Sequence, residues 1–324
     1  MDISIWAWVG FHAVVFVLLA LDLGVFHRSA HEVQVKEAAI WTVVWITLSL
    51  GFNLGLYAWL GPQAGLSFLT GYLIEYSLSI DNIFIFVLLF SFFRVPPAYQ
   101  HRVLFWGILG ALIMRGSMIL LGAALLTQFE WIIYIFGAFL VYTGLRMFFS
   151  RDAEEDIHPE GNLLVRVVRR FLPITKEMRG PHFFVREQGK LMATPLLLVL
   201  LIVESTDLIF AVDSIPAIFG ITRDPFIIYT SNVCAILGLR SLYFLLAGVM
   251  DKFHYLKTGL AVILTFVGMK MLWPEITYLV LHKRYDIPNA LSLGVIVATL
   301  AVAVIASFIR ARRIEAEPPV EVSR

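Results

Sequence analysis

Cysteine is almost absent from this chain: among 324 residues there is one, Cys234, inside an apolar run. A single cysteine excludes an internal disulfide framework and a zinc site made of several thiolates. Charge is scarce too, because Asp, Glu, Lys and Arg make up 15% of the residues, whereas a soluble domain carries about 25%. The formal net charge of +1 provides no strong positive field, so we expect no nucleic acid partner.

Motifs of the common enzyme families are missing as well. The chain contains no HExxH metalloprotease pair, no GxSxG nucleophile turn, and neither a Walker A nor a GxGxxG nucleotide-binding loop. We therefore expect that the protein is not an enzyme, has no permanently bound cofactor, and does not hydrolyse ATP to drive transport.

Apolar residues are abundant instead: they make up 59% of the chain, and the mean hydropathy is +0.82. A membrane-spanning helix needs roughly 20 mostly apolar residues. The N-terminal sequence MDISIWAW lacks the basic region of a secretory signal, so we expect the first apolar range to be retained. The predicted fold class is all-α, a polytopic protein in the lipid bilayer with about nine transmembrane helices. The predicted spans are about 4–26, 39–60, 67–93, 103–126, 129–149, 193–219, 227–249, 257–281 and 289–309.

Lys and Arg are unevenly distributed between these spans. Eighteen fall on one side, eight of them in the long polar stretch 150–192, and three fall on the other side: Arg223, Lys283 and Arg284. Cytoplasmic connections carry the excess of basic residues. We therefore expect a bacterial inner-membrane protein with its N-terminus outside and with the 150–192 loop and the C-terminus in the cytoplasm.

Acidic and amide side chains are concentrated in two of the apolar ranges. A charged side chain at the bilayer centre costs about 2.5–3.5 kcal/mol, so each such residue is a functional-site hypothesis. The seven candidates are Glu75, Asp81 and Asn82 in the third range, and Glu204, Asp207, Asp213 and Ser214 in the sixth.

The two acidic ranges also resemble each other, and the similarity continues downstream. Three spans separate the copies, so the second copy enters the membrane from the opposite side, as in transporters built from inverted repeats. We therefore predict two inverted three-helix repeats, spans 3–5 and 6–8, with peripheral helices around them. The correspondence pairs Glu75 with Asp207, Asp81 with Asp213, Asn82 with Ser214, Arg115 with Arg240, and Arg146 with Lys270.

The repeats divide the chain into five segments. Residues 1–66 hold two N-terminal transmembrane helices, 67–149 the first repeat, and 150–192 the basic cytoplasmic loop. Residues 193–281 hold the second, inverted repeat, and 282–324 the last transmembrane helix and the cytoplasmic tail.

Helical geometry restricts how the acids of one copy can converge. Residues seven apart on an unbroken helix, such as Asp207 and Ser214, lie within about 20° of each other, whereas residues six apart, such as Asp207 and Asp213, differ by about 120°. Pro216 also removes a backbone hydrogen bond. We therefore expect both acidic helices to break, near Asp81 and near Asp213.

Carboxylates, an amide and a hydroxyl are ligands for hard cations such as Mg²⁺, Ca²⁺ or Mn²⁺. A proton relay through the same acids is a second interpretation, and acids that only pair with Arg115 and Arg240 are a third. We predict that Arg115, Arg240 and Lys270 compensate charge when the ion is absent. Asp22, near the inner end of the first span, is a candidate point of ion uptake or a side chain that extends to the headgroups.

Four stretches resemble the TerC/Alx family of bacterial integral membrane proteins, and its Alx branch in particular. They are LDLGVFHRSAHEV at 21–33, EYSLSIDNIF at 75–84, TPLLLVLLIVESTDLIFAVDSIPAIF at 194–219 and GMKMLW at 268–273. The resemblance implies a manganese exporter with an association with tellurite resistance and alkaline stress. It also implies that the seven candidate residues line the ion path. The choice of Mn²⁺ over Ca²⁺ or Mg²⁺ rests on this resemblance alone.

The leading function hypothesis is therefore a secondary transporter that exports Mn²⁺, with proton antiport as its candidate coupling. One alternative is a membrane scaffold or accessory subunit in the response to metal or tellurite stress. Another is a Ca²⁺ or Mg²⁺ carrier on the same fold. The sequence gives no indication of the oligomeric state.

Overall fold

The computed structural model describes residues 3–21, 34–149, 165–166, 170, 172–175, 177–187, 189–247 and 253–316, without the side chains of Asp81 and of residues 314–316. Asp22 and the side chain of Asp81 therefore lie outside the described part of the chain.

The described chain consists of helices and one short β-hairpin. Eight of its spans are long and apolar enough to cross a membrane, with α8 and α9 counted as one, and α1 is a shorter apolar helix of 17 residues. Each of the nine predicted ranges falls on one of these helices, so the all-α polytopic fold class is confirmed. The elements are α1 (Ile5–Leu21), α2 (Val35–Leu60), α3 (Pro62–Phe92), α4 (Pro97–Gln128), α5 (Ile132–Phe149), β1 (Phe184–Glu187), β2 (Lys190–Ala193), α7 (Pro195–Phe219), α8 (Pro225–Leu237), α9 (Leu239–Leu246), α10 (Leu256–Leu281) and α11 (Asn289–Ala316).

Proline begins four of the spans: Pro62 in α3, Pro97 in α4, Pro195 in α7 and Pro225 in α8. Proline suits the first helical turn because the missing N–H has no partner there and the fixed φ is already helical. The turn from α2 into α3 also depends on Gly61, whose φ of 91° lies in the left-handed region that favours glycine. These residues set the boundaries between consecutive spans.

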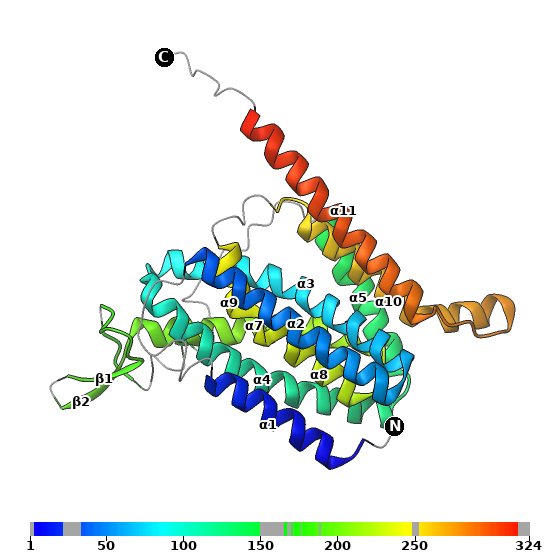
Figure 1. Ribbon diagram of the computed structural model, residues 1–324, viewed down its shortest axis with the longest axis horizontal. Helices are drawn as coiled ribbons and strands as arrows, with labels where there is room; N and C mark the ends of the chain where they lie inside the picture. Colours follow the sequence, from blue (N-terminus) through cyan, green and yellow to red (C-terminus); the bar gives the residue numbers. More distant parts are fainter. Residues whose placement is uncertain are drawn as a thin grey trace.

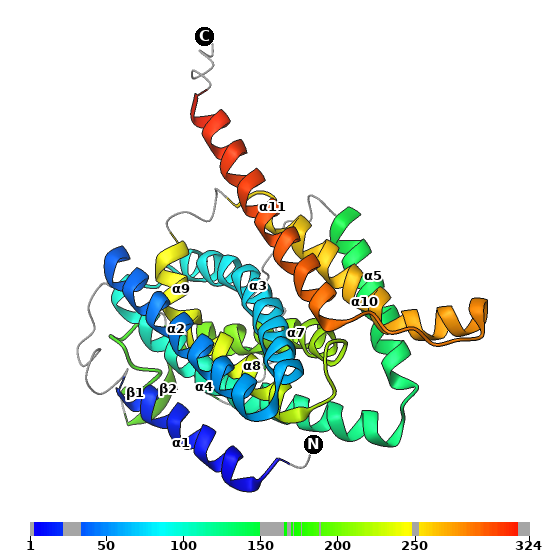
Figure 2. The same cartoon turned by 45° about the vertical axis from the view of Figure 1, so that its right-hand side comes forward.

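Each helix of one predicted repeat packs against a helix of the other repeat. α3 packs against α8, α4 packs against α7, and α5 packs against α10. The first helix of each repeat therefore lies against the second helix of the other, and the third helices face each other. Figures 1 and 2 show α5, α10 and α11 together at one side of the remaining helices. This reciprocal packing favours the predicted repeats, and the segment boundaries given above stay a prediction.

The predicted breaks in the two acidic helices are wrong. α3 runs unbroken from Pro62 to Phe92, and α7 runs unbroken from Pro195 to Phe219 with Pro216 inside it. The side chains of Asn82 and Ser214, beside the two predicted breaks, bond to residues of other helices, as described below, so they do not compete for the backbone of their own helix. Around the centre of the described bundle, the interruption lies instead at Gly238, between α8 and α9.

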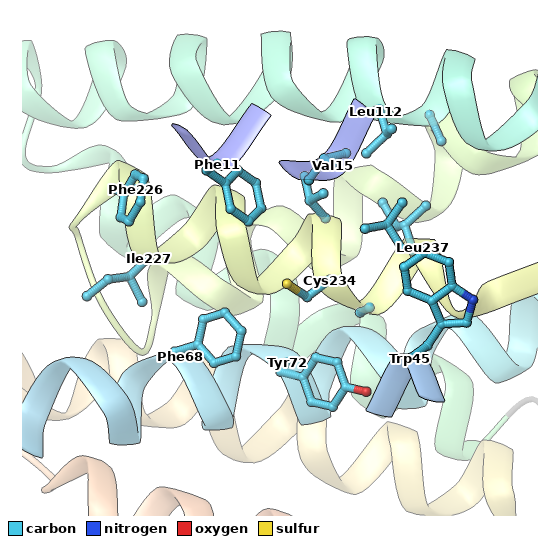
Figure 3. Close-up of a cluster of buried hydrophobic side chains, with 14 of the residues drawn as sticks. Phe11, Val15, Trp45, Phe68, Tyr72, Leu112, Phe226, Ile227, Cys234 and Leu237 are labelled. Atoms are coloured by element: carbon cyan, nitrogen blue, oxygen red, sulfur yellow. The ribbon is translucent and has the colours of Figure 1, made fainter. Parts of the chain in front are cut away.

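α8 and α9 form the most deeply buried of the described spans, since 89% of their apolar window is buried. A cluster of side chains from α1, α2, α3 and α4 surrounds α8 (Figure 3). At the periphery, α11 exposes large apolar side chains such as Val302, which is 67% exposed. In a bilayer these side chains contact lipid. The labelled members of the cluster are Phe11, Val15, Trp45, Phe68, Tyr72, Leu112, Phe226, Ile227, Cys234 and Leu237.

Glycines bring α5 and α10 close together. A Cβ atom on Gly268 of α10 would lie 2.7 Å from the carbonyl oxygen of Gly137 and 2.8 Å from the backbone nitrogen of Val141, both on α5. Small residues permit such close approach of backbones between membrane helices. The third helices of the two predicted repeats therefore form a tightly packed pair beside the central helices.

Candidate functional site

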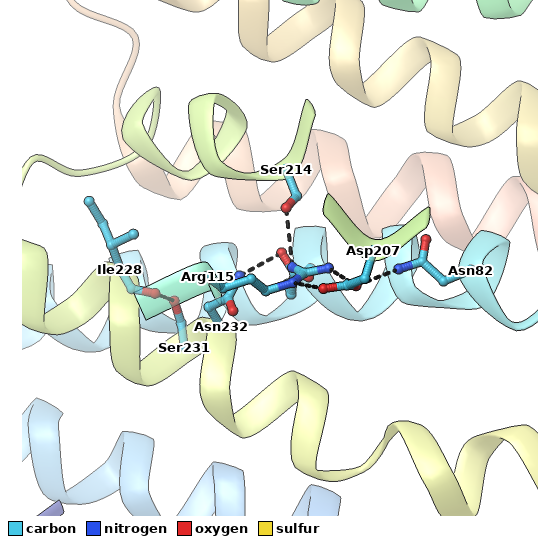
Figure 4. Close-up of polar contacts among 8 residues, drawn as sticks. Asn82, Arg115, Asp207, Ser214, Ile228, Ser231 and Asn232 are labelled. Atoms are coloured by element: carbon cyan, nitrogen blue, oxygen red, sulfur yellow. Dashed lines mark hydrogen bonds and ion pairs between the residues drawn. The ribbon is translucent and has the colours of Figure 1, made fainter. Parts of the chain in front are cut away.

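The guanidinium of Arg115 lies at the centre of a buried polar network (Figure 4). Arg115 projects from the middle of α4 and is 2% exposed. Its Nε and Nη2 atoms donate to Oδ2 and Oδ1 of Asp207 on α7, at 3.0 and 2.7 Å. Its Nη1 atom donates to Oε1 of Glu75 on α3 and, at 3.2 Å, to Oγ of Ser214 on α7. One cation on α4 thus joins carboxylates from both predicted repeats.

Two asparagines complete this network. Nδ2 of Asn82 on α3 donates to Oδ1 of Asp207 at 3.4 Å, and Nδ2 of Asn232 on α8 donates to Oε2 of Glu75 at 2.9 Å. All four carboxylate oxygens therefore accept a hydrogen bond. The Oδ1 atoms of both asparagines have no hydrogen-bond partner in the described structure, although the two side chains are buried. An unpaired buried acceptor costs about 1–3 kcal/mol, so these oxygens are available to a further ligand.

Asn232 is not among the candidates identified from the sequence. It lies within the apolar span Pro225–Leu246 and is fully buried. The signal that could have found it is the one applied to the acids, namely a polar side chain inside a membrane-spanning range. It has no counterpart among the positions matched between the repeats, which is why the repeat pattern does not reveal it.

Residues seven apart on the unbroken helices α3 and α7 point into the same network. Glu75 and Asn82 on α3 both enter the network, as do Asp207 and Ser214 on α7. Asp213 does not enter the network, and its carboxylate lies near the Thr143 hydroxyl on α5. The side chain of Asp81, the counterpart of Asp213, is outside the described part of the chain.

Glu204 precedes Asp207 by three residues on α7 and faces α4. Its carboxylate lies over Gly110, where a Cβ atom would collide with it. The side chain is partly exposed, and it makes neither a hydrogen bond nor an ion pair with another described residue. Glu204 is therefore a carboxylate beside the network that Arg115 does not contact.

The three residues predicted to compensate charge lie in different places. Arg115 is in the network, while Nη1 of Arg240 on α9 lies 3.1 Å from Nε2 of His101 on α4. Lys270 on α10 donates from Nζ to Oδ1 of Asn289 at 2.7 Å. Of these three residues, Arg115 pairs with the candidate acids Glu75 and Asp207.

A cavity of about 450 Å³ lies near the end of α7 that follows Ser214. Under the predicted orientation this is the outer end. Phe219 lines the cavity and follows Ser214 by five residues, which is about 7.5 Å along a helix axis. The charged residues that line it are Glu130, Arg223, Lys270, Arg284 and Asp286.

The network does not present a preformed metal cage. Among the described residues, no group of three or more His, Cys, Asp or Glu side chains is arranged to hold a metal ion. Two carboxylates and one guanidinium give the network a formal charge of −1, so it attracts cations. The position between the carboxylates is taken by the guanidinium of Arg115. The candidates that gather around Arg115 are Glu75, Asn82, Asp207 and Ser214, and their role as metal ligands stays a prediction.

Comparison with known proteins identifies the family. The sequence matches the "Integral membrane protein TerC family" over residues 60–315. It is 52% identical over 305 residues to "Uncharacterized membrane protein STKORF319" of Myxococcus xanthus, covering 94% of this chain and 92% of that protein. It is 52% identical over 303 residues to "Putative membrane-bound redox modulator Alx" of Escherichia coli strain K12, covering 90% of this chain and 91% of that protein. The Salmonella typhi protein of the same name is 50% identical over 308 residues, 92% of each chain. No solved structure matches the sequence. The chain belongs to the TerC family of integral membrane proteins.

Proposed function

We propose that the protein is a secondary transporter that exports a divalent cation, Mn²⁺ in the first place, from the bacterial cytoplasm across the inner membrane. The observation that carries this proposal is the pair of buried carboxylates Glu75 and Asp207, one from each predicted repeat. Inverted-repeat transporters place their substrate near the midplane where the two repeats meet. Acids at that position are expensive in lipid and mark ion pathways.

The surrounding oxygens suit a hard divalent cation. The unpaired Oδ1 atoms of Asn82 and Asn232 add two neutral oxygens to the carboxylates, and Ser214 adds a hydroxyl. Mn²⁺, Mg²⁺ and Ca²⁺ all accept such ligands. The preference for Mn²⁺ comes from the TerC/Alx resemblance, and Ca²⁺ and Mg²⁺ are the alternative cargoes.

The cavity near Phe219 supports a route outwards. An ion that leaves the carboxylates passes Ser214 and then the ring of Phe219, which packs against Phe136 with 6.4 Å between ring centroids. The route crosses this apolar layer before it reaches the charged cavity. Opening of the layer is the outer gating step of the proposal. Proton antiport is the proposed coupling, because carboxylates that release a metal ion can take up protons.

A redox function is a second candidate, because relatives from Escherichia coli and Salmonella typhi carry that word in their names. The only cysteine, Cys234, is buried in α8 at 8% exposure. Thiol–disulfide exchange within the chain is therefore excluded, since such exchange needs two thiols in one chain. An accessory role in redox or metal stress remains the rival to transport.

Flux through purified protein in liposomes tests the proposal. With a Mn²⁺-sensitive dye trapped inside, the wild type should carry Mn²⁺, and excess Ca²⁺ or Mg²⁺ should compete only if it shares the site. Glu75→Gln and Asp207→Asn should each lower the initial rate at least tenfold, because each removes one of the two central charges. Glu187→Gln, on the exposed β-hairpin, is the matched control and should keep the wild-type rate.

Two measurements distinguish transport from the accessory role: flux through a protein that lacks the loop, and flux through the wild type. A protein without residues 151–190 should retain flux if the spans transport, whereas a scaffold that recruits partners through this loop loses its cellular effect. Absence of Mn²⁺ flux in correctly inserted wild type, with a pH gradient imposed in each direction, would refute the transport proposal.

A further inference from the structure

We propose that Arg115 is a built-in competitor of the transported cation. In the empty protein it pairs with both Glu75 and Asp207, and when the cation binds it moves to Glu204. This inference rests on the proposed function and specifies how the site is vacated and reset.

No carboxylate oxygen of Glu75 or Asp207 is without a hydrogen bond. Arg115 engages both oxygens of Asp207 and one of Glu75, and Asn232 engages the remaining one. A cation can therefore reach the carboxylates only if the guanidinium withdraws. The unpaired Oδ1 atoms of Asn82 and Asn232 show that the same place holds ligand oxygens that the guanidinium leaves unused.

The buried negative charge of Glu75 and Asp207 couples cation binding to the withdrawal of Arg115. If Arg115 withdrew and nothing replaced it, two carboxylates would remain buried without a counter-charge. Removing one partner from a buried ion pair is strongly destabilising because the other charge stays in a medium of low dielectric constant. Cation arrival and Arg115 departure are therefore coupled, and so are cation release and Arg115 return.

The carboxylate of Glu204 is the destination of the withdrawn guanidinium. Glu204 lies one helical turn from Asp207 on α7, and its carboxylate rests over Gly110 of α4. Gly110 precedes Arg115 by five residues, about 7.5 Å along the axis of the same helix. Helical side chains lean towards the N-terminus of their helix, so this is the direction in which Arg115 already extends. Glu204 has no hydrogen bond or ion pair with another described residue, so it is available to receive the guanidinium.

The exchange has a consequence for transport. A protein that returns without metal must carry its two carboxylates back through the membrane. Arg115 balances one of the two charges, and the antiported proton of the proposed function balances the other. Without Arg115 the return requires a bound cation or a second proton, so net transport falls relative to one-for-one exchange of Mn²⁺.

Equilibrium binding of Mn²⁺ to the purified full-length protein tests the competition. Arg115→Gln should bind Mn²⁺ at least tenfold more tightly than the wild type, measured by titration calorimetry, because the competitor is gone. Arg115→Lys keeps a positive charge and should restore an affinity closer to that of the wild type. Arg179→Gln, which removes an exposed arginine that pairs with Glu187 of the β-hairpin, is the matched control and should not change the affinity. A purely structural Arg115 predicts the opposite, namely equal or weaker binding in Arg115→Gln.

Two further measurements test the movement itself. In liposomes, Arg115→Gln should raise the ratio of radioactive Mn²⁺ exchange to net Mn²⁺ flux at least tenfold. Glu204→Gln should weaken Mn²⁺ binding at least threefold in the wild-type background and have no effect in Arg115→Gln, because Glu204 acts only by receiving Arg115. Equal effects of Glu204→Gln in the two backgrounds would overturn the switch to Glu204. If the wild type neither binds nor carries Mn²⁺, the proposed function itself fails, whereas unchanged or weaker binding in Arg115→Gln beside an active wild type overturns only this inference.

Discussion

Replacement of Gly268 by Ala probes the contact between the third helices of the two predicted repeats. The added Cβ would lie 2.7 Å from the carbonyl oxygen of Gly137 and 2.8 Å from the backbone nitrogen of Val141. Ordinary van der Waals contact begins at 3.4 Å, so α5 and α10 must separate by about 0.7 Å. Overpacking costs about 1–3 kcal/mol, and backbone atoms cannot rotate away, so we expect a loss of about 2–3 kcal/mol in the free energy of unfolding.

Thermal unfolding in detergent, followed by size-exclusion chromatography of the remaining folded protein, measures this loss. Gly294→Ala on α11 is the matched control, because a Cβ there has nothing within 4 Å. Alanine has the higher helix propensity by about 1 kcal/mol, so the control should unfold at the wild-type temperature or above it. If Gly268→Ala unfolds at the same temperature as Gly294→Ala, the close contact of α5 with α10 is not a source of stability and the reasoning fails.

Two further predictions follow from contacts outside the central network, and a third follows from the distribution of Lys and Arg. Tyr229→Phe removes the hydroxyl that lies 2.9 Å from Nε2 of His12, and denaturant titration should show a loss of about 0.5–1.5 kcal/mol in the free energy of unfolding; an unchanged midpoint would show that the bond between α1 and α8 contributes nothing. Lys270→Met leaves Oδ1 of Asn289 without its 2.7 Å donor, and the same titration should show a loss of about 1–3 kcal/mol, whereas a gain would mean that burying Lys270 costs more than its hydrogen bond returns. A green fluorescent protein fused after Arg324 should fluoresce in the cytoplasm and an alkaline phosphatase fused there should be inactive; the reverse pattern would overturn the predicted orientation.

The architecture was largely predictable because its causes are local. A span requires a run of apolar residues of a certain length, and such runs are visible in the sequence without knowledge of their neighbours. Asp207 and Ser214 could be placed on one face of a helix for the same reason, since the pitch of the helix fixes their relative direction. Both inferences hold in the structure, although the ends of the helices differ from the predicted ranges by several residues.

The parts that could not be predicted depend on contacts between helices. The sequence shows that Asp207 and Glu75 are costly in lipid, but it does not show that the side chain of Arg115 crosses to both of them. Since the sequence does not reveal this contact, it led to the prediction of a break in the helix near Asp213, where exposed backbone would serve the polar groups. Asn232 is visible in the sequence as a polar residue inside an apolar range, but its donation to Glu75, 157 residues away, is not, because no spacing along the chain records such a pairing.

The buried network also sets an order of events during synthesis. Glu75 and Arg115 are 40 residues apart, and Asp207 follows Arg115 by 92 residues. At about 5–20 residues per second, Arg115 leaves the ribosome about 2–8 s after Glu75, and Asp207 about 5–18 s after Arg115. The hairpin of α3 and α4 can therefore enter the membrane with Glu75 and Arg115 already joined as a neutral pair. Asp207 then arrives at a guanidinium that is already bonded to Glu75, so α3 and α4 form the template on which α7 docks.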